Sequence, residues 1–299
     1  MLHFPVLLEE SIGFLVDNKV GSYLDCTFGR GGHSKSILNK LLSEGKLTAF
    51  DKDPDAIKFA ETHIKDPRFN IIYNSFNQID TIFEEGSLDG ILFDLGTCST
   101  HFDDKSRGFS FRDDGPLDMR FNYNTGRPLS KWINIADEKE IINVLYKYGQ
   151  EKNARAIAKA ICVNRKDADI ETTSQLANII KSVSSKKYSK IHPATKSFQA
   201  FRIFINDELN ELDEALNKSK KLIKTGGKIV VISFHSLEDS IVKNTFKTQV
   251  EDIPREIPIN PIVIKEFDCI ARKIRPSDFE VNKNKRSRSA IMRVFKKLP

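Results

Sequence analysis

Short apolar runs alternate with helical patterns of apolar residues between about residues 22 and 96. The apolar runs are strand-like and comprise Tyr23-Leu24, Leu47 to Phe50, Asn70 to Tyr73 and Leu88 to Asp94. Between them lie stretches in which apolar residues recur every three or four positions, the spacing of one helix face. This alternation predicts an α/β fold of the Rossmann-like type, with a mostly parallel sheet and right-handed crossovers. Ligands of such sheets bind at the carboxyl ends of the strands.

The alternation stops at about residue 106. Helical periods alone follow, at 141–148, 154–161 and 176–180, and strand-like runs return at 228–234, 267–274 and 290–295. We therefore predict a discontinuous domain, residues 1–105 and 211–299, that closes around an all-helical substrate-recognition insertion, residues 106–210. The prolines between 253 and 264 predict a loop.

A glycine-rich stretch follows the first strand-like run and opens a helical pattern. Gly29, Gly31 and Gly32 allow a sharp turn and let a ligand approach main-chain N–H groups. The dinucleotide pattern G-x-G-x-x-G is incomplete, because its last glycine is replaced by Ser34. The pattern Asp25-x-Thr27-x-Gly29-x-Gly31 instead resembles the first motif of methyltransferases that use S-adenosylmethionine.

Asp51 ends the second strand-like run, about 20 residues after Gly31, where such folds place an acid on ribose hydroxyls. Taken alone, the glycines could form an ordinary turn, and Asp51 could cap the helix that starts at Pro54. Together the two features favour a site for an adenosine cofactor.

Composition restricts the class of protein. The chain is 39% hydrophobic and 29% charged, as in ordinary globular proteins, with no apolar run long enough to span a membrane and no signal-peptide pattern. Its cysteines are isolated, which argues against a zinc site or a disulfide framework and predicts a cytoplasmic protein with free thiols; they are at positions 26, 98, 162 and 269.

The net charge of +6 is concentrated near the C-terminus. The segment 282–299 contains no acid and leaves the rest of the chain close to neutral; its cations are Lys283, Lys285, Arg286, Arg288, Arg293, Lys296 and Lys297. A concentrated basic segment can bind a phosphate backbone, although a charge run can also be a solvated terminus.

Two further stretches carry candidate chemistry. Asp94-Leu-Gly-Thr-Cys-Ser99 lies at the predicted end of the fourth strand, where it could hold a nucleophile or form a simple turn. The stretch 107–120 interleaves Phe109 and Phe111 with arginines at 107, 112 and 120. Cations that bind phosphates, interleaved with rings that stack on bases, are typical of a single-stranded nucleic-acid site, although rings in loops often pack into the core.

Later in the chain, Phe198, Arg202 and Asn206 recur every four residues on one predicted helix face. His235 precedes a near capping box, Ser236-x-x-Asp239. It could contact substrate, but a structural role is our default for a single histidine.

A dozen blocks, in order from end to end, resemble the MraW family of bacterial 16S rRNA cytosine-N(4) methyltransferases. Its proteins methylate the exocyclic amine of a cytidine in the decoding region of 16S rRNA, using S-adenosylmethionine. The blocks include His3-x-Pro-Val-Leu-Leu8, Thr27-Phe-Gly-Arg-Gly-Gly-His-Ser34, Asp51-Lys-Asp-Pro54, Asp94-Leu-Gly96, Arg107-Gly-Phe-Ser-Phe111, Gly115-Pro-Leu-Asp-Met-Arg120, His192-Pro-Ala-Thr195, Asn206-Asp-Glu-Leu209, Phe234-His-Ser-Leu-Glu-Asp239 and Arg286-Ser-Arg-Ser-Ala290.

The resemblance implies a class I methyltransferase fold. It implies cofactor contacts at Gly31, Gly32, His33, Asp51, Phe76, Asp94 and His101. At His101 the family pattern is usually Ser-Ser-Pro-Gln, whereas this chain has Cys98-Ser-Thr-His101; a histidine can still donate to the ligand. The implied partner is 16S rRNA or the small ribosomal subunit. We expect no membrane partner, and we leave open whether the chain forms a homodimer.

Direct methylation of a cytosine amine requires alignment and a group that draws off the amine hydrogens. Asp94 is our candidate acceptor, Ser99 would assist, and Phe109 or Phe111 would stack on the flipped base. This chemistry requires no metal. The alternatives are methylation at carbon 5 through a covalent Cys98, an assembly factor that uses the cofactor only structurally, and a dehydrogenase, which Ser34 disfavours.

Overall fold

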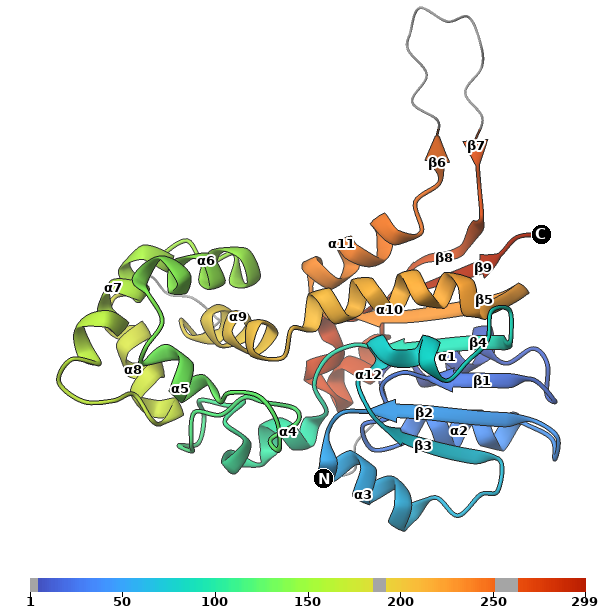
Figure 1. Cartoon of the computed structure of the whole chain (residues 1–299), viewed down its shortest axis with the longest axis horizontal. Coiled ribbons are helices and arrows are strands. Elements are labelled where there is room, and N and C mark those ends of the chain that lie inside the picture. Colours follow the sequence, from blue (N-terminus) through green and yellow to red (C-terminus); the bar gives the residue numbers. More distant parts are fainter. Residues whose placement is uncertain (1–4, 185–191, 251–262) are drawn as a thin grey trace, which may run out of the picture. The chain divides into compact units, whose positions relative to one another are not determined.

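The computed structural model describes residues 5–184, 192–250 and 263–299 (Figure 1). Contacts between Cα atoms divide the chain into two compact units, which we describe separately. The first unit comprises Met1–Gly96 and Leu209–Pro299, and the second comprises Thr97–Glu208. The predicted roles of the two parts, cofactor binding and substrate recognition, stay predictions.

The first unit is built on a seven-stranded sheet with the order β3-β2-β1-β4-β5-β9-β8. Its parallel part is formed by β1 (Ser22–Asp25), β2 (Lys46–Asp51), β3 (Phe69–Tyr73), β4 (Leu88–Asp94) and β5 (Ile223–Ser233). The antiparallel edge is formed by β9 (Ile291–Lys297) and β8 (Phe267–Ile274). The predicted mostly parallel α/β sheet is therefore confirmed.

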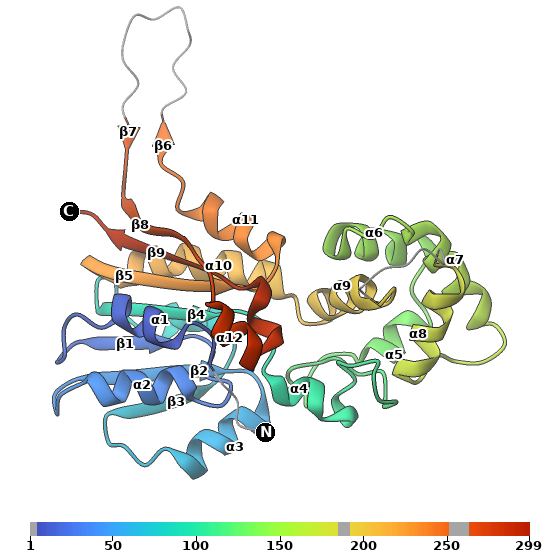
Figure 2. The same cartoon turned by 180° about the vertical axis from the view of Figure 1, so that it is seen from behind.

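Helices cover both faces of this sheet because successive strand residues point to opposite sides. Leu24 and Phe93 pack with α10 (Glu208–Leu222) and α11 (Ser236–Thr245), and Tyr23 and Leu92 pack with α1 (Leu8–Leu15) and α2 (Gly32–Lys40). Figures 1 and 2 show the sheet from its two sides. The unit also contains α3 (Pro54–His63), α12 (Asp278–Lys283) and the 3-10 helices η1 (Phe76–Thr81) and η3 (Lys285–Ser289).

Two details differ from the sequence prediction. β5 begins at Ile223, five residues before the predicted run, because Ile223 pairs with Leu88 and a register shift follows. The predicted loop 253–264 lies largely outside the described residues, but its last two residues form β7 (Val263–Ile264), which pairs with β6 (Gln249–Val250).

In its described part the second unit contains helices joined by loops, and its β pairing is an isolated bridge between Pro116 and Thr172. Its helices are α4 (Ser99–Asp103), η2 (Lys105–Arg107), α5 (Leu129–Ile133), α6 (Glu138–Gly149), α7 (Ala154–Asn164), α8 (Thr173–Ser182) and α9 (Thr195–Ile205). Capping boxes start α6 and α8, and apolar positions spaced by three and four residues, such as Ile141, Val144 and Leu145 of α6, form its own core.

Candidate active site

The loop between β1 and α2 is built around a buried carboxylate. Asp25, the last residue of β1, is fully buried; its Oδ1 accepts the Thr27 N–H at 3.1 Å and its Oδ2 accepts the Ser34 hydroxyl at 2.6 Å. These bonds tie both ends of the glycine loop to the end of the strand. The site predictions omitted Asp25, although its place at the end of the first apolar run was the available signal.

The loop glycines have left-handed backbone angles, with φ of 56° at Gly29 and 71° at Gly31. A Cβ on Gly31 would lie 2.8 Å from the ring of Phe28, so this glycine is needed for packing. A Cβ on Gly29 would meet nothing within 4 Å, so Gly29 faces open space. A ligand can approach the loop backbone there without meeting a side chain.

Asp51, at the end of β2, turns toward this loop. Its Oδ2 accepts the Gly29 N–H at 2.8 Å and its Oδ1 accepts the Asp53 N–H at 2.9 Å. The cap of α3 is Asp53, whose carboxylate accepts the Asp55 N–H. The alternative in which Asp51 is only a helix cap is therefore wrong.

Asp94, at the end of β4, lies next to the same loop. Its N–H donates to Thr27 Oγ1 at 2.7 Å, and its Oδ2 lies 3.5 Å from His33 Nδ1. Phe76 begins η1 just after β3 and meets Phe93 edge-on at a centroid distance of 5.8 Å. The structure thus brings Gly31, Gly32, His33, Asp51, Phe76 and Asp94 to one end of the sheet in the first unit.

His101, Ser99 and Phe109 belong to the second unit. Ser99 begins α4, and His101 is buried in a ring cluster with Phe109 and Phe121, at centroid distances of 5.1 and 5.2 Å. Phe109 is only 4% exposed, so a base could stack on it only after the cluster opens. Its predicted stacking role stays a prediction.

The predicted phosphate-binding arginines differ in their surroundings. Arg107 is buried and donates to the carbonyls of Arg120 and Phe121. Arg120 forms a bidentate ion pair with the Asp118 carboxylate. Arg112 is exposed. Two of the three arginines therefore hold the loop together, and Arg112 is the most accessible to a phosphate.

Two residues that the sequence singled out, Asn206 and His235, make hydrogen bonds that hold local structure. Asn206 accepts the Phe121 N–H at 2.7 Å and donates to the Met119 carbonyl, which anchors the arginine loop to the end of α9. His235 caps α11 by accepting the Glu238 N–H, and Glu238 completes the capping box. The near capping box predicted to start at Ser236 is therefore wrong by one residue, and the default structural role of His235 fits this geometry.

Burial raises the pKa of Asp25 to about 6, against the lowering effect of its bonds from Ser34 and Thr27, while the Asp51 charge raises it further. Because this pKa exceeds the ordinary value of 3.8, the unfolded state loses its proton first as pH rises, and ionisation favours unfolding. Between about pH 4 and pH 7 this costs about 3 kcal/mol of folding free energy.

We expect Asp25→Asn, which cannot ionise, to gain stability relative to the parent protein as pH rises from 4 to 7.5. Urea unfolding at both pH values measures the difference. Asp66→Asn is the matched control, and its stability relative to the parent should stay nearly constant over this range. The bond from Arg68 holds the pKa of Asp66 below its usual range, so this carboxyl is ionised in both the folded and the unfolded protein above about pH 4. A pH-independent difference for Asp25→Asn would contradict the buried ionisation.

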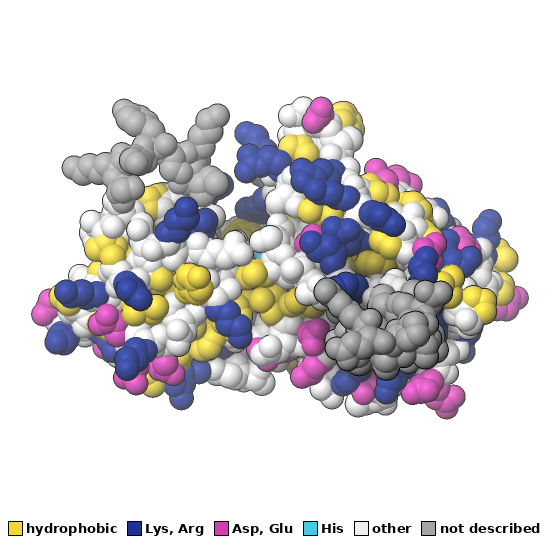
Figure 3. All heavy atoms as spheres, turned by 90° about the horizontal axis from the view of Figure 1, so that it is seen from above, with side chains coloured by type: hydrophobic (Ala, Val, Ile, Leu, Met, Phe, Trp, Pro, Cys, Tyr) yellow, Lys and Arg dark blue, Asp and Glu magenta, His cyan; other side chains and the backbone are white. Residues whose placement is uncertain are grey.

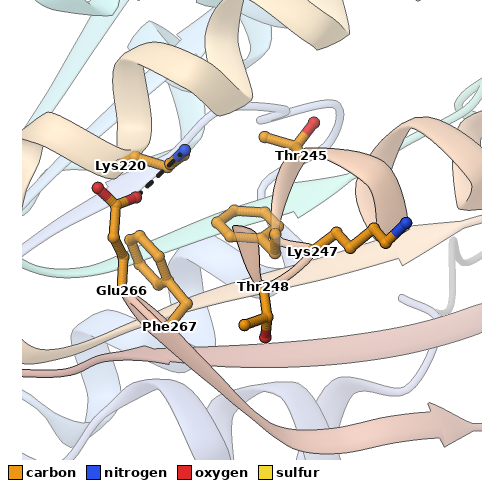
Figure 4. Close-up of a pocket in the computed structure, with 7 residues that line it drawn as sticks. Lys220, Thr245, Lys247, Thr248, Glu266 and Phe267 are labelled. Atoms are coloured by element: carbon orange, nitrogen blue, oxygen red, sulfur yellow. Dashed lines mark ion pairs between the residues drawn. The ribbon is translucent and has the colours of Figure 1, made fainter. Parts of the chain in front are cut away.

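One hollow of the described residues is too small for a cofactor. A hollow lined by Lys220, Thr245 and Glu266, among others, has a volume of about 10 Å³, which holds about one water molecule (Figure 4). No group of three or more described His, Cys, Asp or Glu side chains could hold a metal ion. No described helix is long and apolar enough to cross a membrane.

A mostly parallel sheet, with a glycine loop after β1 and acids at the ends of β1, β2 and β4, is a cofactor-binding fold of the Rossmann-like class, to which class I methyltransferases belong. The chain belongs to the MraW methylase family, whose model matches residues 1–298. Its methyl donor is accordingly S-adenosylmethionine, as the sequence predicted.

Similar proteins include the "Ribosomal RNA small subunit methyltransferase H" of Ruthia magnifica, with 45% identity over 99% of this chain and 98% of that protein. The protein with the same name from a Marinomonas strain is 43% identical over 99% of this chain and 97% of its own. Among solved structures, an rRNA methylase from Streptococcus thermophilus shows a weak likeness, with 10% identity, a TM-score of 0.44 and coverage of 100% and 99% of the two chains.

Proposed function

We propose that this chain transfers a methyl group from S-adenosylmethionine to the exocyclic N4 amine of a cytidine in the decoding region of 16S rRNA. The observation that carries the proposal is the Asp94 carboxylate, which ends β4 beside the loop whose glycines and Asp51 fit an adenosyl cofactor. The names of the similar proteins support small-subunit rRNA as the substrate.

The cofactor, when bound, supplies an activated methyl group. We propose that it is held by residues of the first unit, namely Gly31, Gly32, His33, Asp51, Phe76 and Asp94. His101 stays a proposed further contact, implied by the family resemblance. The open side of Gly29 supports this placement, because a ligand can reach the backbone N–H groups at the start of α2.

The chain's own task is then alignment and proton removal. The cytosine amine is a poor nucleophile, because its lone pair is delocalised into the ring. A carboxylate that accepts a proton from the amine increases the electron density on the nitrogen as the new carbon–nitrogen bond forms. We assign this role to Asp94, with Ser99 assisting and Phe109 as the candidate ring for the flipped base.

Carbon-5 methylation is the alternative that requires Cys98 as a covalent nucleophile. Cys98 is a partly exposed cysteine that precedes α4. Enzymes that methylate carbon 5 typically have a proline directly before the nucleophilic cysteine, whereas this chain has Thr97 before Cys98. Direct transfer to the amine is therefore favoured.

RNA binding has a candidate surface in the C-terminal basic segment. Arg293 pairs with Asp239 at 2.6 Å, and Lys297 donates to the carbonyls of Lys220 and Ile223, so these two cations hold the fold. The cations on α12 and η3 are exposed; they are Lys283, Lys285, Arg286 and Arg288. Figure 3 shows Lys and Arg side chains gathered on the side of the first unit that carries α11.

Changing these four exposed cations to Gln should flatten the salt dependence of RNA binding. Each lost phosphate contact should lower the log–log slope by about 0.7–0.9. Binding of small-subunit RNA across a salt series measures the slope. The control changes four exposed lysines of α2, β2 and the α3 region to Gln, namely Lys40, Lys46, Lys58 and Lys65. Equal slopes in the two variants would make the basic segment a solvated tail.

The function itself is tested by nucleoside analysis of small-subunit RNA from cells that lack the protein. N4-methylcytidine should disappear, and it should return when the parent chain is supplied but not when Asp94→Asn is supplied. Unchanged N4-methylcytidine in the deficient cells would overturn the proposal. An rRNA substrate would also fit the cytoplasmic location expected from the sequence.

A further inference from the structure

His33 has a fixed ring orientation. Its Nε2 lies 3.2 Å from the Val6 carbonyl oxygen, and its Nδ1 lies 3.5 Å from Asp94 Oδ2. A carbonyl oxygen only accepts, so Nε2 must carry the hydrogen of this bond. In the neutral ring Nδ1 is then an acceptor, and it faces the carboxylate.

The Val6 carbonyl is itself held in place. Leu7, the next residue, is fully buried with a left-handed backbone (φ 52°), and its N–H donates to Glu280 Oε1 of α12 at 2.8 Å. Pro5 packs against the α-carbon of Gly32, where a Cβ would lie 2.2 Å from the proline ring. This short segment therefore fixes which nitrogen of His33 is protonated.

The position of the ring argues against a purely cofactor-binding role for the His33 side chain. The residue is 5% exposed, and its two nitrogens face Val6 and Asp94. The cofactor contact implied at His33 can be made by the backbone at the start of α2, which leaves the ring for another task.

We propose that His33 is the proton partner of Asp94, a positioning residue whose Nδ1 takes up the proton that the carboxylate receives during methyl transfer. This inference rests on the proposed function, in which Asp94 accepts the amine hydrogen. Methyl transfer forms a carbon–nitrogen bond at the cytosine amine and breaks a carbon–sulfur bond, whose electron pair stays on sulfur. One amine proton then leaves nitrogen for Asp94, passes to Nδ1 to give an imidazolium, and is finally lost to solvent.

Transfer of the proton to His33 would return Asp94 to its charged carboxylate form. A protonated carboxylate cannot accept a second proton, so each turnover requires that the first be removed. The His33 Nδ1 lies 3.5 Å from Asp94 Oδ2 while Nε2 is held by the Val6 carbonyl, so the ring needs only a small movement to accept this proton. The imidazolium so formed faces a carboxylate, which stabilises its charge.

His33→Gln tests the proposal, because the Gln amide can still donate to the Val6 carbonyl but cannot take up a proton. We expect methyl transfer at saturating cofactor and RNA to slow by about tenfold or more, below the 10²–10⁴-fold typical of a primary acid–base group. The cofactor dissociation constant, measured by calorimetry, should change by less than about threefold. The matched control is His63→Asn, an exposed histidine on α3, which should retain the parent rate.

A weaker cofactor affinity with an unchanged saturated rate would overturn the proposal and make His33 a binding residue. A slow Asp94→Asn variant combined with a normal His33→Gln variant would overturn it while leaving the proposed function intact. Full activity of Asp94→Asn would remove Asp94 as the acceptor and this proposal with it, whereas the proposed function itself would still be decided by the identity of the methylated nucleoside.

Nitrogen-15 NMR of the histidine rings gives a test that does not depend on activity or on the folding of a His33 variant. In the parent protein the neutral His33 ring should carry its hydrogen on Nε2, and the protonated ring should show a Nδ1 hydrogen shifted strongly downfield by Asp94. That shift should vanish in Asp94→Asn. A neutral ring protonated on Nδ1 would overturn the proposal.

Discussion

Asp94→Asn is expected to lower the rate of methyl transfer by about 10²–10⁴-fold at saturating cofactor. The asparagine keeps the shape of the side chain, and position 94 contributes only its backbone N–H to the bond with Thr27 Oγ1, so the loop should remain in place. What is lost is the proposed proton acceptor, because the amide oxygen of Asn accepts a hydrogen bond but does not take up a proton. Single-turnover assays on small-subunit RNA measure the rate, and calorimetry separates any loss of cofactor affinity.

Cys98→Ala is the matched comparison at the neighbouring position. In direct transfer it removes only a small side chain, so the rate should stay within about threefold of the parent. A covalent nucleophile is indispensable, so abolished activity with cofactor affinity intact would support carbon-5 chemistry instead. A nearly normal rate for Asp94→Asn would remove Asp94 as the acceptor.

Asp51→Ala should weaken S-adenosylmethionine binding by about 1.5–3 kcal/mol, the usual value of hydrogen bonds to a charged group. Its carboxylate is the predicted ribose contact, and it also accepts the Gly29 and Asp53 N–H groups, so its removal loosens the loop as well. Calorimetry measures the affinity, and thermal unfolding checks that the variant folds.

Two variants refine that result. Asp51→Asn keeps one acceptor oxygen for the Gly29 N–H and should bind more tightly than Asp51→Ala. Asp66→Ala removes a partly exposed acid that pairs with Arg68 before β3, and it should leave the cofactor affinity unchanged. Unchanged affinity in a folded Asp51→Ala variant would remove Asp51 from the site.

The sequence predicted the sheet because strand periodicity depends on local side chains. Tyr23 and Leu24 are adjacent in the chain and pack on opposite faces of the sheet, so the run is apolar throughout, as buried parallel strands require. The ends of β1, β2 and β4 follow from the same runs, and with them the positions of Asp25, Asp51 and Asp94.

Features that depend on contacts distant in sequence could not be predicted. The early start of β5 depends on pairing with Leu88, and the fixed ring of His33 depends on Val6 and Glu280. Phe109 and Arg107 matched the pattern of a nucleic-acid loop, yet tertiary packing buries both. Interleaved rings and cations do not reveal whether they face a base or each other.

The central claim is tested most directly by the chemical identity of the product. Purified protein would be given small ribosomal subunits that lack the modification, together with methyl-labelled S-adenosylmethionine, and the RNA would be digested to nucleosides for mass spectrometry. The account predicts that the label appears in N4-methylcytidine. Label in 5-methylcytidine would contradict direct transfer to the amine and identify Cys98 as the residue to study next.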